Sequence, residues 1–257
     1  MHGNHQKKIM RPNLFLAFVI LFAFQISTAS GQEPDPGKKE VESFNGLFAL
    51  QVGLPTSGMQ EAIQNDMANA GIGAGLILLS NPATWGDKKR NSPLRIGLEA
   101  GYTYYRRFIT DVDINGYQGD YKTSYGIFQL NTLLQVRPRI SEKITPFIEL
   151  LAGGNFYISR IKDNLGVLES SLGIENIDLG SYSSASFNKG VAFGCYIGNH
   201  QKIGAAKFAI RASYNRGGNI GYIVRNSVAY DPSGSRLTYE TGEAPANYFM
   251  VQVGVGW

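Results

Sequence analysis

Apolar and polar residues alternate strictly in the last ten residues of the chain, 248–257. An alternation with a period of two predicts a strand with one apolar face and one small or polar face. Tilted in a sheet, such a strand advances roughly 20 Å, close to the apolar band of ~25 Å in a membrane-spanning barrel. The apolar face is formed by Phe249, Val251, Val253, Val255 and Trp257.

The same alternation recurs in seven other segments, which gives eight expected strands. They cover residues 44–53, 71–80, 94–110, 121–137, 145–158, 186–198, 205–216 and 248–257. Lipid cannot satisfy open backbone groups, so strands cross a membrane only in a closed sheet, and an even number of antiparallel strands achieves this. The expected fold is therefore all-β: an eight-stranded antiparallel up-and-down transmembrane β-barrel with long external hairpins.

Two other architectures fit parts of the pattern. Residues 221–230 and 235–240 also look extended, and a barrel that includes them has ten strands. We prefer eight strands with projecting hairpins, because Arg225, Asn226 and Arg236 are poor lipid-facing residues. A soluble up-and-down barrel would turn its apolar face inward. The many Gly, Ala and Ser residues of the opposite face fit a narrow lumen better than a water-facing exterior.

The lengths of the connections predict which end of the barrel is which. Outer-membrane barrels have short periplasmic turns and longer external loops. The segments near residues 139–144 and 199–204 are short, and the polar segment 81–93 is placed with them. The long segments lie near residues 54–70, 107–121, 159–185 and 217–245.

Residues 1–31 have the pattern of a secretory signal peptide. A positive region with Lys7, Lys8 and Arg11 precedes an apolar stretch, and small residues allow cleavage after Ala29 or Gly31. The apolar stretch spans about 13 residues, too few for a transmembrane anchor, which needs ~20. Export through the periplasm to the cell outer membrane is expected. Residues 32–43 form a flexible leader, and residues 44–257 form the outer-membrane β-barrel domain.

The charge balance changes once the signal is removed. The chain has 24 Lys+Arg and 20 Asp+Glu, but three of the basic residues lie in the signal, which leaves 21 against 20. This near-neutral balance removes the main support for binding nucleic acid. The only cysteine, Cys195, excludes an intramolecular disulfide and is interpreted as an apolar filler.

The chain resembles the small eight-stranded outer-membrane β-barrels of Gram-negative bacteria, the outer membrane protein A/X-like family. The residues that carry the resemblance are Phe48–Pro55, Pro93–Tyr102, Pro146–Gly154 and the terminal strand. It covers nearly the whole mature chain through alternation and glycine content. The resemblance implies contact with outer-membrane lipid, and a terminal aromatic, Trp257, that the barrel-insertion machinery reads.

Charged residues also fall on the face that points into the lumen. They are Arg95, Glu99, Arg137, Glu149 and Arg211. Opposite charges in a narrow lumen should pair, because an isolated buried charge is costly. Side chains can fill an eight-stranded barrel, so a salt-bridged, plugged lumen is favoured over a gated pore or a proton path.

One motif is a weak calcium candidate. Asp111, Asp113 and Asn115, followed by Gly116, match the first half of a calcium-binding loop, but the twelfth position is Lys122 instead of glutamate. Asn-Gly is also the preferred pair for a two-residue hairpin turn. The hairpin is favoured, and no metal or cofactor is expected.

Catalysis finds little support in the sequence. Some outer-membrane barrels are hydrolases that use histidine with Ser or Asp near the external rim. Here the only mature histidine, His200, falls in an expected periplasmic turn. We expect a protein that is not an enzyme and that acts through its external hairpins on an extracellular protein or polymer. The alternatives are a narrow channel and, least favoured, an enzyme acting on outer-membrane lipid.

Overall fold

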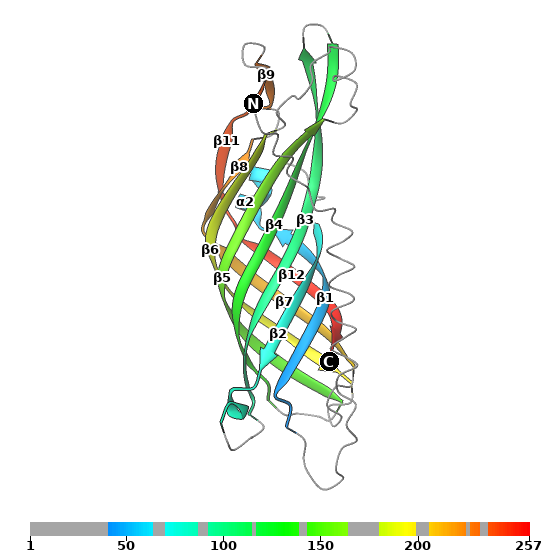
Figure 1. Cartoon of the computed structure of the whole chain (residues 1–257), viewed down its shortest axis with the longest axis vertical. Coiled ribbons are helices and arrows are strands. Elements are labelled where there is room, and N and C mark those ends of the chain that lie inside the picture. Colours follow the sequence, from blue (N-terminus) through cyan, green and yellow to red (C-terminus); the bar gives the residue numbers. More distant parts are fainter. Residues whose placement is uncertain are drawn as a thin grey trace, which may run out of the picture.

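The computed structural model is a tall closed barrel whose strands tilt around a central axis (Figure 1). The structure describes residues 41–63, 70–86, 92–114, 117–138, 143–163, 180–198, 206–224, 227–231 and 236–257. The expected signal peptide, most of the leader, Asn115 and His200 lie outside these residues. Within them, no helix is long and apolar enough to cross a membrane.

Eight strands close the barrel, in the order β1-β12-β7-β6-β5-β4-β3-β2. Each is antiparallel to both neighbours. Their bounds are β1 Phe44–Pro55, β2 Gly71–Ser80, β3 Leu94–Ile114, β4 Tyr117–Val136, β5 Ile144–Asp163, β6 Ser181–Ile197, β7 Lys207–Gly217 and β12 Tyr248–Gly256. Every expected strand is present within a few residues of its expected ends, and the eight-stranded antiparallel fold is confirmed.

The first and last strands of the barrel form the closing seam. β1 pairs with β12 from Leu47 opposite Gly256 to Pro55 opposite Tyr248. The start of β1 and the end of β12 therefore lie at one end of the barrel, together with the connections after β2, β4 and β6. We call this the turn end and the opposite end the loop end.

β3 and β4 extend furthest past the barrel at the loop end (Figure 1). β2 pairs with β3 only as far as Tyr104, whereas β3 and β4 continue, after an irregularity between Tyr105 and Arg107, to Ile114 opposite Tyr117. β5 follows β4 as far as Asp163. Apolar and polar residues keep alternating along this hairpin, which explains why it stays extended beyond the other strands.

The connection from β7 to β12 contains short strands that lie outside the closed sheet. β8 (Asn219–Ile223) pairs with β11 (Thr241–Pro245), and β9 (Ala229–Asp231) pairs with β10 (Arg236–Thr238). The ten-stranded alternative is therefore wrong.

In the described part of the chain, two short helices complete the fold. α2 (Ser57–Ile63) follows β1, and η1 (Pro82–Thr84) follows β2. The side chain of Asn81 caps η1 by accepting a hydrogen bond from the Ala83 backbone N–H, and a proline begins the helix.

The outer face of the barrel wall is apolar and the inner face is buried. On the outer face, Ile72, Phe193 and Leu50 expose 70%, 66% and 65% of their surface. Their chain neighbours point inward, as the pleat of a strand requires. So many large apolar side chains on the exterior fit a hydrocarbon solvent. The soluble-barrel alternative, with apolar residues inward and polar residues outward, is the reverse of this arrangement.

Candidate functional site

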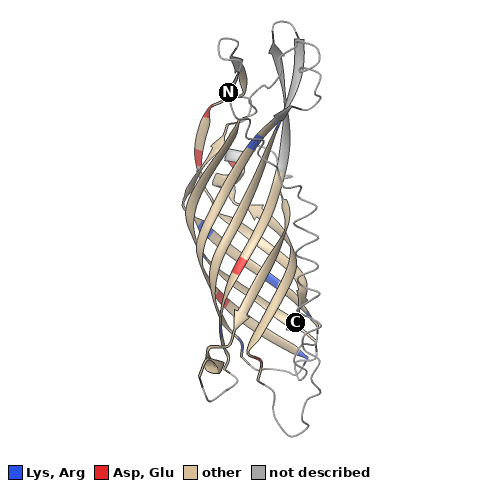
Figure 2. Cartoon of the chain, in the orientation of Figure 1, with Lys and Arg blue, Asp and Glu red and all other residues tan. Residues whose placement is uncertain are grey.

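The barrel interior contains most of the buried polar and charged side chains of the described residues, while most of the wall carries only isolated charges (Figure 2). Four groups fill it. The central polar network surrounds Arg211, an apolar layer lies on each side of it, and a separate ionic cluster lies at the turn end.

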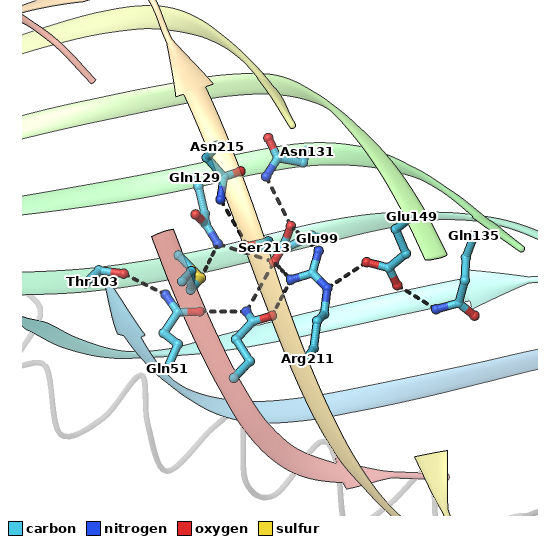
Figure 3. Close-up of polar contacts among 12 residues, drawn as sticks. Gln51, Glu99, Thr103, Gln129, Asn131, Gln135, Glu149, Arg211, Ser213 and Asn215 are labelled. Carbon is cyan, nitrogen blue, oxygen red and sulfur yellow. Dashed lines mark hydrogen bonds and ion pairs between the residues drawn. The ribbon is translucent and has the colours of Figure 1, made fainter. Parts of the chain in front are cut away.

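Arg211 on β7 is the centre of the polar network (Figure 3). Its Nε donates to Glu149 Oε2 at 2.6 Å, and its Nη1 donates to Glu99 Oε1 at 2.8 Å. These three side chains expose only 1–2% of their surface. The two carboxylates come from β3 and β5, so Arg211 ties three strands together across the lumen.

Amide side chains satisfy the remaining capacity of the two carboxylates. Glu99 also accepts from Gln129, Asn131 and Gln252, at 3.3, 3.1 and 3.2 Å. Gln135 donates to Glu149 at 2.5 Å. One arginine faces two carboxylates, and these neutral donors offset the surplus negative charge. A buried ion pair is tolerated only when its remaining hydrogen-bonding sites are filled in this way.

The network continues to the closing seam. Gln252 on β12 donates to Gln51 on β1 at 2.9 Å, and Gln51 donates to Thr103 on β3 at 2.8 Å. A chain of amides therefore links the last strand to the first and to the third.

An apolar layer lies toward the turn end. It consists of Leu47, Ala49, Ile77, Leu79, Leu133, Phe147, Leu151, Ala192, Tyr196 and Ala209. The rings of Phe147 and Tyr196 lie 4.8 Å apart. The sequence predicts a small or polar lumen and misses this layer, because adjacent residues such as Leu150 and Leu151 are both apolar although only one faces lipid.

A second apolar layer closes the lumen toward the loop end. It consists of Met59, Tyr105, Tyr125, Ile127, Tyr157, Ile220, Ala246, Tyr248 and Met250. Met59 belongs to α2 and Ile220 to β8, so two elements of the loop end lie over the barrel mouth. The Tyr125 hydroxyl donates to the Ile223 carbonyl at 2.9 Å, which joins β4 to β8.

The turn-end cluster consists of Glu42, Arg95, Arg137 and Lys207. Lys207 Nζ lies 2.6 Å from Glu42 Oε1, while Arg137 Nη1 and Arg95 Nη2 lie 3.1 and 3.6 Å from Oε2. Burial alone would raise the pKa of the Glu42 carboxyl. The attraction of Lys207, Arg137 and Arg95 outweighs it and holds that pKa below its ordinary value.

The five charged residues singled out in the sequence all point inward, but the structure divides them between two sites. Glu99, Glu149 and Arg211 share the central network, whereas Arg95 and Arg137 belong to the turn-end cluster. The sequence does not predict Glu42 as a member of this cluster, because residue 42 falls in the expected flexible leader. No local pattern marks it, since its partners are distant in the sequence.

The calcium candidate falls on an extended hairpin. Asp111 and Asp113 lie in β3, opposite Asp120 and Gln118 on β4. A calcium loop folds around its ion, whereas these residues follow a straight ladder. Within the described part of the chain, no group of three or more His, Cys, Asp or Glu side chains could hold a metal ion.

The terminal strand presents its apolar face outward. Phe249, Val251, Val253 and Val255 expose between 41% and 52% of their surface. At the turn end, the Trp257 indole lies against Gly46. Tyr214 and Phe249 form an aromatic pair, with ring centroids 4.8 Å apart.

A closed antiparallel barrel with a lipid-type exterior and a hydrogen-bonded polar interior is a transmembrane β-barrel, and its eight strands place it among the small outer-membrane β-barrel proteins.

Solved barrels of this class resemble the chain at low sequence identity. Neisserial surface protein A is 10% identical to this chain, with a TM-score of 0.46. The match covers 83% of this chain and 95% of that one. A major outer membrane protein of Thermus thermophilus is 11% identical with a TM-score of 0.45, covering 82% of this chain and 98% of that one.

The attachment invasion locus protein Ail of Yersinia pestis, solved with the heparin analogue sucrose octasulfate, is 12% identical with a TM-score of 0.36, covering 84% of this chain and 97% of that one. No protein-family model matches the chain, and no curated protein matches it closely enough to count as a relative.

Proposed function

We propose that this protein is a non-conducting outer-membrane barrel that holds an interaction surface at its loop end, on the outside of the cell. It reaches the membrane through the periplasm after loss of residues 1–31, and the barrel-insertion machinery reads its terminal strand. The role is structural or adhesive, and the proposal assigns no catalytic residue, metal or cofactor.

The observation that carries the proposal is the bridge from Arg211 to Glu99 and Glu149. It spans the lumen between β7, β3 and β5, and it lies between two apolar layers. An ion crossing the barrel would have to separate a buried pair with completed hydrogen bonds, and breaking such a pair is costly. This arrangement suits a stabilising plug better than a permanent channel.

The loop end offers the surface for a partner. β3 loses its pairing with β2 after Tyr104 but continues to Ile114, and no described strand pairs with that edge beyond Tyr104. An unpaired strand edge presents backbone donors and acceptors that an extended segment of a partner protein can use. β8 and β11 form a second ordered element at the loop end.

Planar-bilayer recording on the purified protein tests the plugged lumen. We expect no steady conductance from the wild type. A variant with Arg211→Ala, Glu99→Ala and Glu149→Ala removes the bridge and should conduct if the central network is the main barrier. Steady conductance by the wild type would instead favour the narrow-channel alternative.

A trimmed loop tests the interaction role. The Ala246 N–H donates to the Gly218 carbonyl at 3.0 Å, so residues 219–245 can be replaced by a short glycine linker without stretching the barrel. The wild type and this variant, both in vesicles, are applied to an array of extracellular proteins and polysaccharides. We expect the wild type to bind at least one and the variant to lose that binding. Equal binding by both would refute a role for this loop.

A further inference from the structure

We propose that the turn-end cluster is a carboxylate-binding site in which Glu42 is a built-in, exchangeable occupant. The site would accept a small carboxylate-bearing solute from the turn-end side of the membrane when Glu42 leaves. This inference concerns the end opposite the proposed interaction surface and does not depend on it.

Three cations from three parts of the barrel meet at one carboxylate. Arg95 is the second residue of β3, Arg137 follows β4, and Lys207 begins β7. Their exposed fractions are only 5%, 8% and 5%. Their nitrogen atoms lie 3.6, 3.1 and 2.6 Å from the two oxygens of Glu42. Three largely desolvated positive charges therefore share a single carboxylate as their ion-pair partner.

The cluster retains a net positive charge with Glu42 in place. Among the described residues, Glu42 is the only acidic side chain that forms an ion pair with any of these three cations. The Arg95 Nε is buried and makes no hydrogen bond within the described structure. A buried donor without a partner costs free energy, so the site has both the charge and the donor for another anion.

The two arginines of the cluster are held in place by contacts other than those with Glu42. Arg137 donates to Asn45 Oδ1 at 3.0 Å and lies 4.7 Å from the centre of the Tyr196 ring. It also donates to Gln135. Arg95 donates to the carbonyls of Ser92 and Leu94. Such preorganisation means that the binding geometry should survive when the occupant leaves.

Glu42 itself does not belong to a barrel strand, because it lies two residues before β1. Its segment is attached to the turn end by Asn81, whose Nδ2 donates to the Glu42 carbonyl at 3.3 Å and whose backbone N–H donates to the Ser43 carbonyl at 2.8 Å. These bonds belong to the segment just before β1 and not to the barrel ladder. Replacing Glu42 therefore breaks no strand pairing, whereas Glu99 and Glu149 belong to barrel strands.

The chemistry of the site selects a carboxylate. Two planar guanidinium groups and one ammonium group match the two oxygens of a carboxylate, and the present occupant shows that a carboxylate fits. Acetate has the same hydrogen-bond-accepting group as the Glu42 side chain and is small enough to enter the space that Glu42→Ala would leave. It is therefore a suitable probe.

Chemical rescue tests the proposal on the full-length mature protein in detergent. We expect Glu42→Ala to lower the melting temperature, and sodium acetate to raise it again by about 2–4 °C more than sodium chloride at equal ionic strength. The wild type, whose site is filled, should show a smaller difference between the two salts. Direct binding of ¹³C-labelled acetate to Glu42→Ala, seen by NMR line broadening, should accompany the rescue.

The double variant Glu42→Ala/Arg137→Gln is the matched control and should lose the acetate-specific effect. If Glu42→Ala fails to refold in chloride, recovery of refolding in acetate supports the site and failure in both salts contradicts it. Equal responses to acetate and chloride in Glu42→Ala, with no line broadening, would overturn the proposal.

Discussion

The indole ring of Trp257 fills the space that a side chain at Gly46 would need. A Cβ placed on Gly46 would lie 2.3 Å from Cζ2 of Trp257. The backbones of the two residues also exchange hydrogen bonds, with N–O distances of 3.2 and 3.0 Å. The terminal aromatic is therefore attached to the first strand of the barrel by shape as well as by the sheet ladder.

The replacement Gly46→Ala should displace the Trp257 ring. Forcing an added methyl group into a filled space costs about 1–3 kcal/mol. We expect an unfolding midpoint at lower urea in vesicles and a red-shifted Trp257 emission, measured with Trp85→Phe so that Trp257 is the only tryptophan. The control is Gly154→Ala, because the nearest atom to a Cβ at Gly154 is 3.7 Å away. Equal effects of both alanines would contradict the fit between Gly46 and Trp257.

Arg211→Met should destabilise the barrel strongly. It leaves Glu99 and Glu149 buried without their cation, and the loss of one partner from a buried ion pair costs about 3–5 kcal/mol. Urea unfolding in vesicles measures the change in the free energy of unfolding. Adding Glu99→Gln and Glu149→Gln should recover much of the loss, whereas Arg216→Met, at an exposed position on β7, should have little effect. No recovery in the triple variant would argue against charge as the cause.

Because of the turn-end cluster, the stability of the folded protein should fall at acidic pH. The pKa of Glu42 in the folded protein lies below its ordinary value of 4.5. A lowered carboxyl pKa gives stability that is fully present above the ordinary value and is lost as the pH falls through the folded value. The wild type should exceed Glu42→Gln in melting temperature near pH 7, and the gap should shrink as the pH falls below 4.5. A gap that stays constant with pH would exclude the Glu42 carboxylate as its source.

Tyr125→Phe should loosen the cover of the barrel mouth without opening the barrel. It removes the hydrogen bond from the Tyr125 hydroxyl to the Ile223 carbonyl, a bond worth about 1 kcal/mol. Hydrogen exchange should become faster in β8 and β11 and stay unchanged in β1 and β12. Tyr104→Phe, at an exposed position on the outer face, is the control and should leave exchange in β8 unaltered.

The positions of the strands and the directions of their faces could be predicted, because lipid requires an apolar side chain at nearly every outward-facing position. Leu50, Val253 and Phe193 are each exposed on the outer face as their alternation indicates. The interior has no such single requirement. Polar residues such as Gln129 and Asn131 are buried there as well as Phe147 and Leu151, provided that each polar group forms a hydrogen bond.

Contacts between distant segments could not be predicted from local pattern. Met59 was expected in an external loop, yet it is fully buried over the barrel mouth. Glu42 pairs with Lys207, which is 165 residues further along the chain. Nothing in the neighbouring residues encodes such partners, because closing the barrel is what brings them together.

The seam between β1 and β12 also sets a condition on biogenesis. Phe44–Pro55 is synthesised long before its final partner in the sheet, Tyr248–Gly256. Until that partner arrives, one margin of the nascent sheet stays open and prone to mispairing. A polypeptide without Tyr248–Gly256 therefore cannot close the barrel, and a helper that shields the early margin until this strand arrives would prevent aggregation.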